Sequence, residues 1–296
     1  MIDKPTWRST LKAYLYLLPM LLVIVTFNIL PIFRSFEMSL WQDYNFFTQE
    51  VFEYGFGPFQ EIFQDSDFWL AIRNTFIFVL GVVPVSIMIS LGIAVLLNQI
   101  KFLSGFFRSI YFLPFVTSTI AVSIVWRWLY HSDYGLINYF LSFFNIEAIA
   151  FMEDPKFAML ALVMMSIWKG LGFNIVIFLV GLNNISDTYY AAAKIDGAGP
   201  WQRFTNITLP LLTPTMFLVS IMGVINSFKA FDEVYALFNG RPGPANSALT
   251  MVYYIFQKFY EESQYALASA AGIILFLIIL VFTLMQMAVN RYINQQ

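Results

Sequence analysis

Six apolar runs, each long enough to cross a lipid bilayer, divide this sequence and constrain its fold more than any other feature. A transmembrane helix needs about 20 mostly apolar residues. The runs cover about residues 13–33, 68–97, 107–130, 157–182, 209–231 and 265–289. Charged residues make up only 11% of the chain, too few to cover the surface of a water-soluble core. The sequence therefore predicts an all-α polytopic membrane protein with six transmembrane helices in one domain over residues 1–296.

Two other interpretations of these runs are less favoured. Strands of a membrane β-barrel alternate apolar and polar residues over about 10 positions, whereas these runs stay apolar throughout. Pro84, Pro114 and Pro214 lie within the runs, and membranes tolerate proline there when neighbouring groups satisfy the freed carbonyls. The first run is long and has no small-residue cleavage pattern, so we expect it to be retained as a span rather than removed as a signal peptide.

The composition also excludes several kinds of site. The chain has no cysteine, so a disulfide framework or a thiolate metal site is impossible. His131 is the single histidine, which excludes a two-histidine site. The sequence has no phosphate-binding GxxxxGK[ST] motif, so any nucleotide-driven work needs a separate ATPase. We expect no catalytic residue, no metal site and no cofactor in this chain, and the net charge of −2 gives no indication of a nucleic-acid partner.

The two sides of the predicted bundle differ in cation density. The side that holds both termini, with segments 1–12, 98–108, 183–210 and 290–296, carries eight lysines and arginines in 58 residues, and the other side carries four in 93. Cytoplasmic segments of membrane proteins are enriched in lysine and arginine, so both termini are predicted to be cytoplasmic. Four further cations lie in the spans or at their ends, and assigning them all to the outer side would equalise the two counts.

The stretch YYAAAKIDGAGPWQRFTNITLP, residues 189–210, interrupts the apolar pattern on the side of the termini. Ser186 is a favourable N-cap for a helix that begins at Asp187, and Gly197 can adopt the left-handed conformation that ends it. Pro200 suits the first turn of a second helix. We therefore predict a helix, a glycine corner and a second, amphipathic helix. These residues leave two interpretations equally open, a connector that lies on the lipid headgroups and a docking site for another protein.

This loop resembles the EAA loop of permease subunits in binding-protein-dependent ABC importers, in which EAA is followed by glycine and by a hydrophobic stretch ending in Leu-Pro. Two further stretches, FLPFVTSTIAVSIVWRWLYHSDYGLIN (112–138) and FDEVYALFNGRPGPANSALTMVYYIFQ (231–257), resemble the carbohydrate branch of that family. The resemblance covers about residues 10–290. It is closest to the first permease of a sugar importer pair, of the maltose and glycerol-phosphate type.

The resemblance implies a multi-pass subunit in a prokaryotic plasma (inner) membrane. Its expected partners are a second permease, a cytoplasmic dimer of ABC ATPases that binds ATP and Mg²⁺, an extracytoplasmic solute-binding protein, a carbohydrate substrate and the lipid bilayer. The loop 186–208 would contain the coupling helix that docks on an ATPase. The coupling residues implied in this way are Ala191, Ala192, Ala193, Asp196, Gly197, Ala198 and Phe204. The family's glutamate falls at Ala191, so one charged contact with the ATPase is missing in this chain.

Lys169 is a charged residue near the middle of a predicted span. A lysine that faces lipid costs at least about 2.5 kcal/mol, so we expect it to face a wet cavity or to pair with a carboxylate; a snorkelling or structural lysine is the alternative. Sugar sites combine aromatic faces with polar groups, and the fourth and fifth spans supply both. Together with the positions that the resemblance implies for sugar contacts, the expected substrate path comprises Ser166, Trp168, Lys169, Gly170, Phe173, Gly223, Asn226, Ser227 and Ala230. Any single aromatic residue taken alone is better explained by ordinary packing.

Three other cations receive a simpler interpretation. Arg127 lies between two tryptophans and is expected in the outer aromatic belt, and Arg73 and Lys229 lie near the outer ends of spans. Among the outer loops, residues 37–68 and the turn-forming segment 239–247 would, by the resemblance, contact the solute-binding protein. A loop folded over the outer cavity is equally open for both.

The resemblance and the residues together predict a transmembrane subunit of an ABC importer that takes up carbohydrate, expected to be an oligosaccharide, along a path shared with a second permease. One alternative is an ABC permease for a non-sugar solute such as a polyol phosphate. Another is a polytopic membrane enzyme, but this would need clustered acids near a membrane face, and the acids at 153–154 and 232–233 are too weak a signal. A secondary carrier is the third alternative, and the sequence has no inverted repeat of broken helices to support it.

Overall fold

The computed structural model describes residues 7–45, 48, 50–99 and 104–294. These residues form two compact units. Unit 1 comprises Met1–Asp65 and Ile255–Ile274, and unit 2 comprises Ser66–Tyr254 and Leu275–Gln296. Lys4 and Lys101, which contribute to the orientation argument, lie outside the described residues. The cytoplasmic location of both termini therefore stays a prediction, as does the assignment of the whole chain to one domain.

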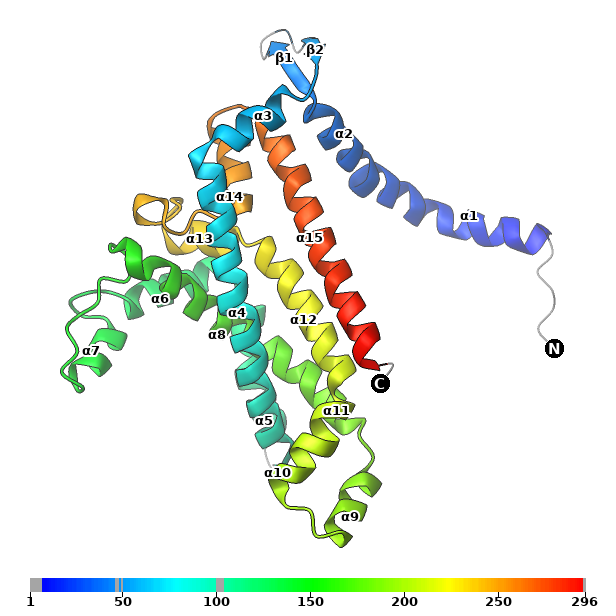
Figure 1. Ribbon diagram of the computed structural model, residues 1–296, viewed down its shortest axis with the longest axis vertical. Coiled ribbons are helices and arrows are strands. Elements are labelled where there is room, and N and C mark those ends of the chain that lie inside the picture. Colours follow the sequence, from blue (N-terminus) through cyan, green and yellow to red (C-terminus); the bar gives the residue numbers. More distant parts are fainter. Residues whose placement is uncertain (1–6, 46–47, 49, 100–103, 295–296) are drawn as a thin grey trace. The chain divides into compact units, whose positions relative to one another are not determined.

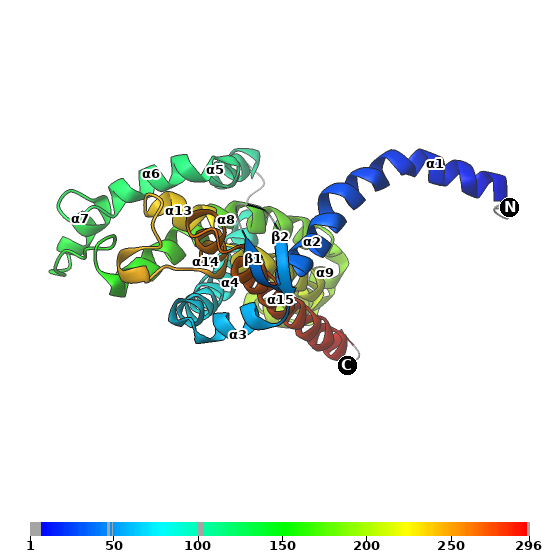
Figure 2. The ribbon, with the colours of Figure 1, turned by 90° about the horizontal axis from the view of Figure 1, so that it is seen from above.

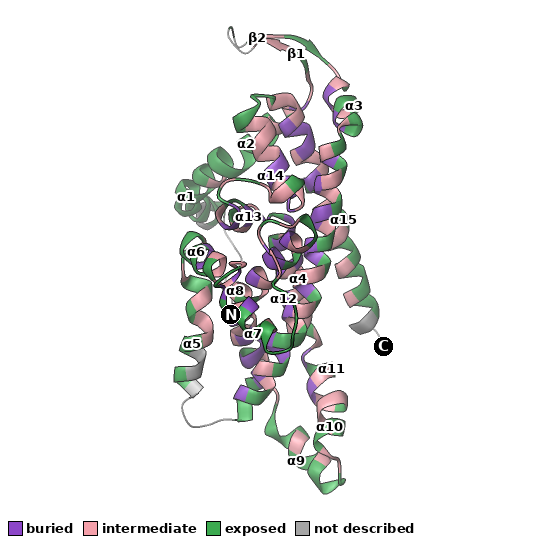
Figure 3. Cartoon of the chain, turned by 90° about the vertical axis from the view of Figure 1, so that its left-hand side faces the viewer, coloured by how far each residue is buried: buried purple, intermediate pink, exposed green. Residues whose placement is uncertain are grey.

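The first apolar run forms a helix in unit 1 that buries none of its apolar stretch. It consists of α1 (Trp7–Ile24), a π-helical turn (Val25–Ile29) and α2 (Leu30–Met38). Over Thr10–Met38 it is long and apolar enough to cross a membrane, yet 0% of its most apolar window is buried within the chain, as the exposed colour of α1 in Figure 3 shows. An apolar surface of this length needs lipid or another protein to cover it.

Unit 1 also contains two short strands, so the prediction of an all-α chain is wrong in this detail. β1 (Trp41–Asn45) and β2 (Glu50–Tyr54) pair antiparallel and are followed by α3 (Gly57–Gln64). Aromatic residues occur in both strands, and β2 also contains the β-branched Val51; both residue types favour extended structure. Within the predicted outer loop 37–68, the described residues thus form a hairpin of two strands and a helix.

Lys258 joins two segments of unit 1 that are far apart in the sequence. Its amine lies 3.2 Å from a carboxylate oxygen of Asp65 and 2.8 Å from one of Glu262. It belongs to a π-helical turn (Gln257–Glu261) after α14 (Met251–Phe256). Burial alone would lower the pKa of Lys258, but its hydrogen bonds and attraction to the two carboxylates outweigh burial and raise that pKa above its usual value.

The long helices α4 (Ser66–Gln99) and α8 (Pro155–Asn183) form the centre of unit 2. α5 (Ser104–Val116) packs against α8, and α12 (Thr213–Phe228) packs against α4 (Figure 1). Helix α15 (Tyr265–Asn294) contributes to both units. The buried apolar core that joins α4, α8 and the start of α12 contains Leu91, Ala94, Leu97, Ile175, Phe178, Leu179, Leu182, Leu212 and Val219.

Glycines allow several of these helices to approach closely. A Cβ added at Gly81 on α4 would lie 3.2 Å from Val163 of α8, and one at Gly181 on α8 would lie 2.6 Å from Thr215 of α12. At Gly172 it would lie 2.0 Å from the carbonyl oxygen of Tyr111 on α5. Small residues at such contacts are typical of helix packing in membranes, so these glycines fix how the helices around the cavity described below are spaced.

Two of the six predicted spans are bent. Within the described residues, four helices are long and apolar enough to cross a membrane, and the number rises to six if each of two bent pairs counts as one span. α5 and α6 (Thr119–Leu129) meet at 105°, and the helix before α12 meets α12 at 62°. The runs predicted as single spans at 107–130 and 209–231 are therefore each interrupted by a bend. Ser118, with ψ of 135°, breaks the first, and Pro214 cannot donate a helical hydrogen bond in the second.

Shorter elements connect these helices in unit 2. Figure 2 shows α5, α6 and α7 following one another along one side, with α13 beside α6. Their bounds are α7 Leu136–Ser142, α13 Asp232–Leu237 and a 3₁₀ turn at Pro244–Asn246. The predicted turn at 239–247 is confirmed, because its backbone has positive φ at Asn239, Gly240, Gly243, Ala245 and Asn246.

We expect Thr75→Val to destabilise this unit more than its small change in shape suggests. The Thr75 hydroxyl is buried, donates to the carbonyl of Ala71 at 2.8 Å and accepts from the amide of Met251 at 2.9 Å. Valine keeps the volume but leaves that buried amide without its partner, which costs about 1–3 kcal/mol. The measurement is the thermal unfolding midpoint of the purified protein.

The matched control is Thr283→Val on α15. That hydroxyl donates within its own helix, to the carbonyl of Ile279 at 2.8 Å. Its loss therefore leaves no amide of another segment without a hydrogen-bond partner. An equal loss of stability in the two variants would contradict the role given to Thr75.

Candidate functional site

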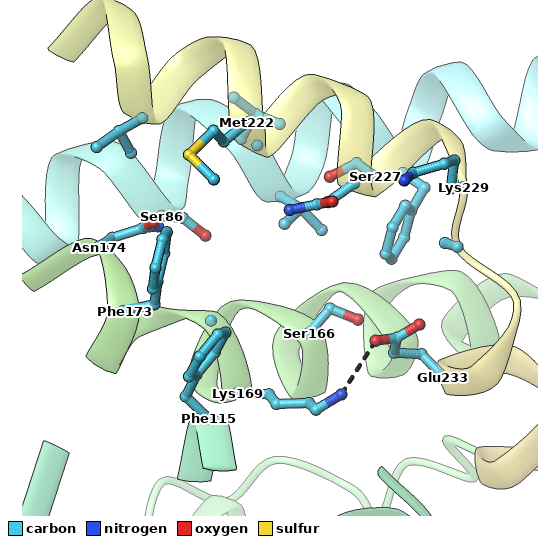
Figure 4. A pocket seen from close by; sticks show the side chains of 18 of the residues that line it. Ser86, Phe115, Ser166, Lys169, Phe173, Asn174, Met222, Ser227, Lys229 and Glu233 are labelled. Carbon is cyan, nitrogen blue, oxygen red and sulfur yellow. Dashed lines mark hydrogen bonds and ion pairs between the residues drawn. The ribbon is translucent and has the colours of Figure 1, made fainter. Parts of the chain in front are cut away.

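A cavity of about 430 Å³ lies within unit 2 (Figure 4). α4, α8 and α12 form most of its wall, and α5, α13 and the segment between α12 and α13 complete it. The lining residues are Phe78, Val82, Val83, Ser86, Ile87, Phe115, Ser166, Lys169, Gly170, Phe173, Asn174, Val219, Met222, Gly223, Asn226, Ser227, Lys229, Ala230, Asp232 and Glu233. Its volume lies within the range of small-molecule sites, roughly 300–1,000 Å³.

Eight of the nine residues predicted for the substrate path line this one cavity. They are Ser166, Lys169, Gly170, Phe173, Gly223, Asn226, Ser227 and Ala230. The ninth, Trp168, does not line it: its side chain is 41% exposed and packs edge-on against Trp126, with 5.7 Å between ring centroids. Neighbouring residues of a helix point about 100° apart, so Lys169 faces the cavity and Trp168 faces away.

The cavity combines aromatic rings with hydroxyl and amide groups. Phe115 of α5 stacks on Phe173 of α8, with ring centroids 5.0 Å apart and planes at 24°. Asn174 and Asn226 supply amides on facing helices. The hydroxyl oxygen of Ser166 is buried and has no hydrogen-bond partner among the described residues, and such groups are costly unless a partner binds them. The arrangement can therefore hold a ring with apolar faces and hydroxyl edges.

Lys169 both faces the cavity and pairs with a carboxylate, which were the two alternatives expected for it. Its amine lies 3.3 Å from Oε1 of Glu233 on α13 and donates a hydrogen bond to the hydroxyl of Thr119 on α6. The two charged side chains are only 18% and 24% exposed. Glu233 was missed as a site residue, because Asp-Glu after the fifth span is a weak pattern and its partner is 64 residues away.

Two cations make contacts that the sequence did not predict. Lys229 lies at the end of a span, as expected, and also lines the cavity. It follows directly on the last residue of α12, so its position depends on where that helix ends. Arg127 was assigned to the aromatic belt, but its guanidinium donates a hydrogen bond to the side-chain oxygen of Asn239. The side chain thus ties the end of α6 to the turn that follows α13.

The loop at 186–208 has the predicted shape of helix, glycine corner and helix. α9 (Asp187–Ile195) is capped by Ser186, whose hydroxyl accepts from the amide of Thr188 at 3.4 Å. The second arm continues from α10 (Pro200–Arg203) through a π-helical segment (Phe204–Thr208) into α11 (Leu209–Leu211). The hydroxyls of Tyr190 and Thr208, 2.9 Å apart, join the two arms.

Gly197 closes α9 in a Schellman motif. Its φ is +77°, its amide donates to Lys194 at 3.1 Å, and the amide of Ala198 donates to Ala193 at 2.8 Å. These two hydrogen bonds satisfy carbonyls at the end of the helix. The glycine corner predicted from the sequence is therefore confirmed in its conformation.

The predicted coupling residues differ in their exposure. Ala191, Ala192, Asp196 and Gly197 are exposed, whereas Ala193, Ala198 and Phe204 are half-buried. Phe204 packs against the core shared by α4, α8 and α12. The loop also exposes large apolar side chains at Tyr189, Ile195 and Trp201, of which Ile195 is 87% exposed. Both arms thus expose apolar side chains, and the second arm is also anchored in the helix core through Phe204.

The part of the chain that the structure describes contains no group of three or more His, Cys, Asp or Glu side chains that could hold a metal ion. The acids near the cavity, Asp232 and Glu233, are accompanied by Lys169 and Lys229. The local chemistry is that of hydrogen bonding and charge pairing.

The chain is similar to known proteins over nearly its whole length. A family model described as "Binding-protein-dependent transport system inner membrane component" matches residues 83–295. The trehalose/maltose transport system permease protein MalF of Thermococcus litoralis is 31% identical over 290 residues, 98% of this chain and 97% of that protein. The lactose transport system permease protein LacF of Rhizobium radiobacter is 35% identical over 289 residues, 94% of this chain and 96% of that protein.

A solved structure has the same fold. A chain of a bacterial ABC transporter involved in the import of the acidic polysaccharide alginate superposes with a TM-score of 0.81, at 25% sequence identity, and the match covers 96% of each chain.

Proposed function

The chain belongs to the family of binding-protein-dependent transport system inner membrane components, and on that premise we propose that it forms, with a second permease, the membrane path of an ABC importer for carbohydrate. Relatives that share nearly its full length carry names that specify trehalose and maltose or lactose. A sugar is therefore the favoured cargo, ahead of a polyol phosphate, and an oligosaccharide fits the relatives best.

The cavity of unit 2 is the observation that carries this proposal. Eight residues expected to contact sugar line it, and it offers stacked aromatic rings, amides and the partnerless hydroxyl of Ser166. Sugar binding needs these groups together, because ring faces are apolar and ring edges carry hydroxyls. We propose that this cavity is this chain's part of the translocation path.

The energy for transport would enter through the loop at 186–208. In this proposal the exposed α9 and the glycine corner dock on a cytoplasmic ATPase that binds ATP and Mg²⁺, and the second arm passes the movement to α12 through Phe204 and the core. The chain would have no enzymatic activity of its own. Ala191 stands where the family has a glutamate, so apolar contacts through Tyr189, Ile195 and Trp201 would replace the missing charge.

The remaining partners follow from the same assignment. We propose a multi-pass location in a prokaryotic inner membrane, a second permease subunit, an ATPase pair and an extracytoplasmic solute-binding protein. The neighbouring fold occurs in an ABC importer, which supports this composition. The outer segments of residues 37–68 and 239–247 would face the solute-binding protein.

The test is reconstitution of the complex in lipid vesicles with its second permease, ATPases and solute-binding protein. ATP hydrolysis is measured with a panel of di- and oligosaccharides and with glycerol 3-phosphate. We expect at least one sugar to stimulate hydrolysis several-fold and to be taken up. Stimulation by glycerol 3-phosphate alone, or a catalytic activity of the isolated chain, would contradict the proposal.

A further inference from the structure

The cavity is lined by equal numbers of positively and negatively charged side chains. Among the described residues that line it, Lys169 and Lys229 are the cations and Asp232 and Glu233 are the anions. The remaining lining groups are apolar side chains, hydroxyls, amides and glycine. The cavity as this chain builds it therefore has a net charge of zero.

Lys169 and Glu233 are the least exposed of these four charged residues and form an ion pair. Its oxygen and nitrogen lie 3.3 Å apart, and neither side chain is more than 24% exposed. The Lys169 amine also lies at the N-terminus of α6, because it donates a hydrogen bond to Thr119, the first residue of that helix. Helix N-termini carry partial positive charge, so without a carboxylate the amine would add to a positive region. Glu233 is thus the group that cancels the charge of Lys169.

A cation without this partner would attract anionic cargo. Charges interact more strongly in a site partly shielded from water than in bulk solvent. A half-buried lysine beside the hydroxyl and amide groups of the cavity would form charge-assisted hydrogen bonds with a carboxylate or a phosphate. With Glu233 at 3.3 Å, the amine is already neutralised and offers such a ligand no net attraction.

We propose that Glu233 is a specificity-determining residue of the transport path: by neutralising Lys169 it makes the cavity select uncharged sugars and disfavour sugars that carry a carboxylate or a phosphate. This inference rests on the proposed function, since it concerns the cargo of the same cavity. It names a residue outside the predicted substrate path and a charge class for the cargo.

The absence of cysteine from the chain allows a direct measurement of the potential in the cavity. Met222 lines the cavity, is 37% exposed and points into it in Figure 4, so Met222→Cys places one thiol there. The rates of modification by an anionic and a cationic methanethiosulfonate reagent are measured on the assembled complex, and the labelled peptide is assigned to this chain by mass spectrometry. The rate of the anionic reagent divided by that of the cationic reagent is then normalised to the same quotient for Ser142→Cys, where the residue at the end of α7 is exposed.

We expect the normalised ratio in the Met222→Cys background to lie within about threefold of one. Adding Glu233→Gln should raise it roughly four- to fifteenfold at low salt, as for one unit charge acting over on the order of 10 Å at an effective dielectric constant of about 40–80. Lys169→Met with Glu233→Gln should return it to the starting value. Glu147→Gln, which removes an exposed acid of the same unit that does not line the cavity, should leave it unchanged.

Two results of this measurement would overturn the inference. If the unmodified cavity strongly favoured the anionic reagent, the potential in the assembled complex, including the contribution of the second permease, would be positive. An unchanged ratio after Glu233→Gln would show that Glu233 does not set the potential. Neither result depends on sugar transport, so the outcome is separate from that of the proposed function.

Transport selectivity completes the test. A neutral oligosaccharide that stimulates the complex is compared with the same sugar oxidised to a uronate at its primary alcohol, both at saturating concentration of the binding protein. We expect the ratio of uronate to neutral uptake to rise at least several-fold in Glu233→Gln relative to the unmodified chain, and not in the double variant. A higher uptake of uronate than of neutral sugar by the unmodified complex would overturn the inference. Failure of every sugar would instead contradict the proposed function.

Discussion

Replacing Gly172 with alanine is expected to prevent stable assembly of unit 2. A Cβ at this position would lie 2.0 Å from the carbonyl oxygen and 2.7 Å from the carbonyl carbon of Tyr111, and 2.8 Å from the Cα of Phe112. These are backbone atoms of α5, so no side-chain rotation can relieve the clash. Overpacking costs about 1–3 kcal/mol and occasionally more, and a contact this short requires α5 to move away from α8.

The measurement is the yield and thermal unfolding midpoint of the purified complex. Because α5 also carries Phe115 into the cavity, any protein that still folds should lose the Phe115–Phe173 stack and with it sugar-stimulated ATP hydrolysis. The matched control is Gly92→Ala on α4, where an added Cβ would meet no atom within 4 Å; alanine there should be neutral or slightly stabilising. Similar behaviour of the two variants would contradict the close packing of α5 on α8.

The second large effect is expected at the glycine corner. Gly197→Val should reduce uptake about tenfold or more while leaving the helices of unit 2 folded. The φ of +77° at this position is strongly unfavourable for a β-branched residue, at about 1–3 kcal/mol for a residue held in such a conformation. Relief of this strain would turn α9 away from the second arm. If the loop couples to the ATPase as proposed, a loss of about 1.4 kcal/mol in the docked arrangement lowers its population about tenfold, and uptake should fall with it.

Asparagine provides the matched control at the same position. It tolerates the left-handed conformation, and an added Cβ at Gly197 would meet no atom within 4 Å. Gly197→Asn should therefore keep most of the uptake that valine loses. Equal activity of the glycine, asparagine and valine proteins would contradict both the importance of the corner's conformation and the assignment of the loop as the coupling element.

Much of the architecture could be predicted from local sequence signals. Apolar run length predicted the helices, because a segment without water must satisfy its backbone internally. The corner at Gly197 could be predicted because helices commonly end at a glycine in the left-handed conformation, which few other residues adopt. Ser186 as a cap has the same origin. Such signals act over a few residues, so they do not depend on how the chain folds back on itself.

The bends and the strands could not be predicted in the same way. Pro114 and the Ser118 break lie in a run whose composition is continuous with that of a straight span, and the 105° turn depends on what α5 and α6 pack against. Likewise, the aromatic residues at 41–54 suit a loop or a hairpin. Composition restricts these segments to a few conformations, and packing selects one of them.

The candidate site shows where local signals end and long-range contacts begin. The sequence placed a lysine in mid-span and so required a polar environment or a carboxylate for Lys169, but it could not identify the carboxylate. Glu233 comes from α13, and its distance of 3.3 Å from Lys169 depends on the packing of α13 against α6 and α8. Adjacent Trp168 meets Trp126 instead of the cavity. Chain chemistry thus determined which groups needed partners, and the helix orientations set by packing across the whole unit determined which partners they found.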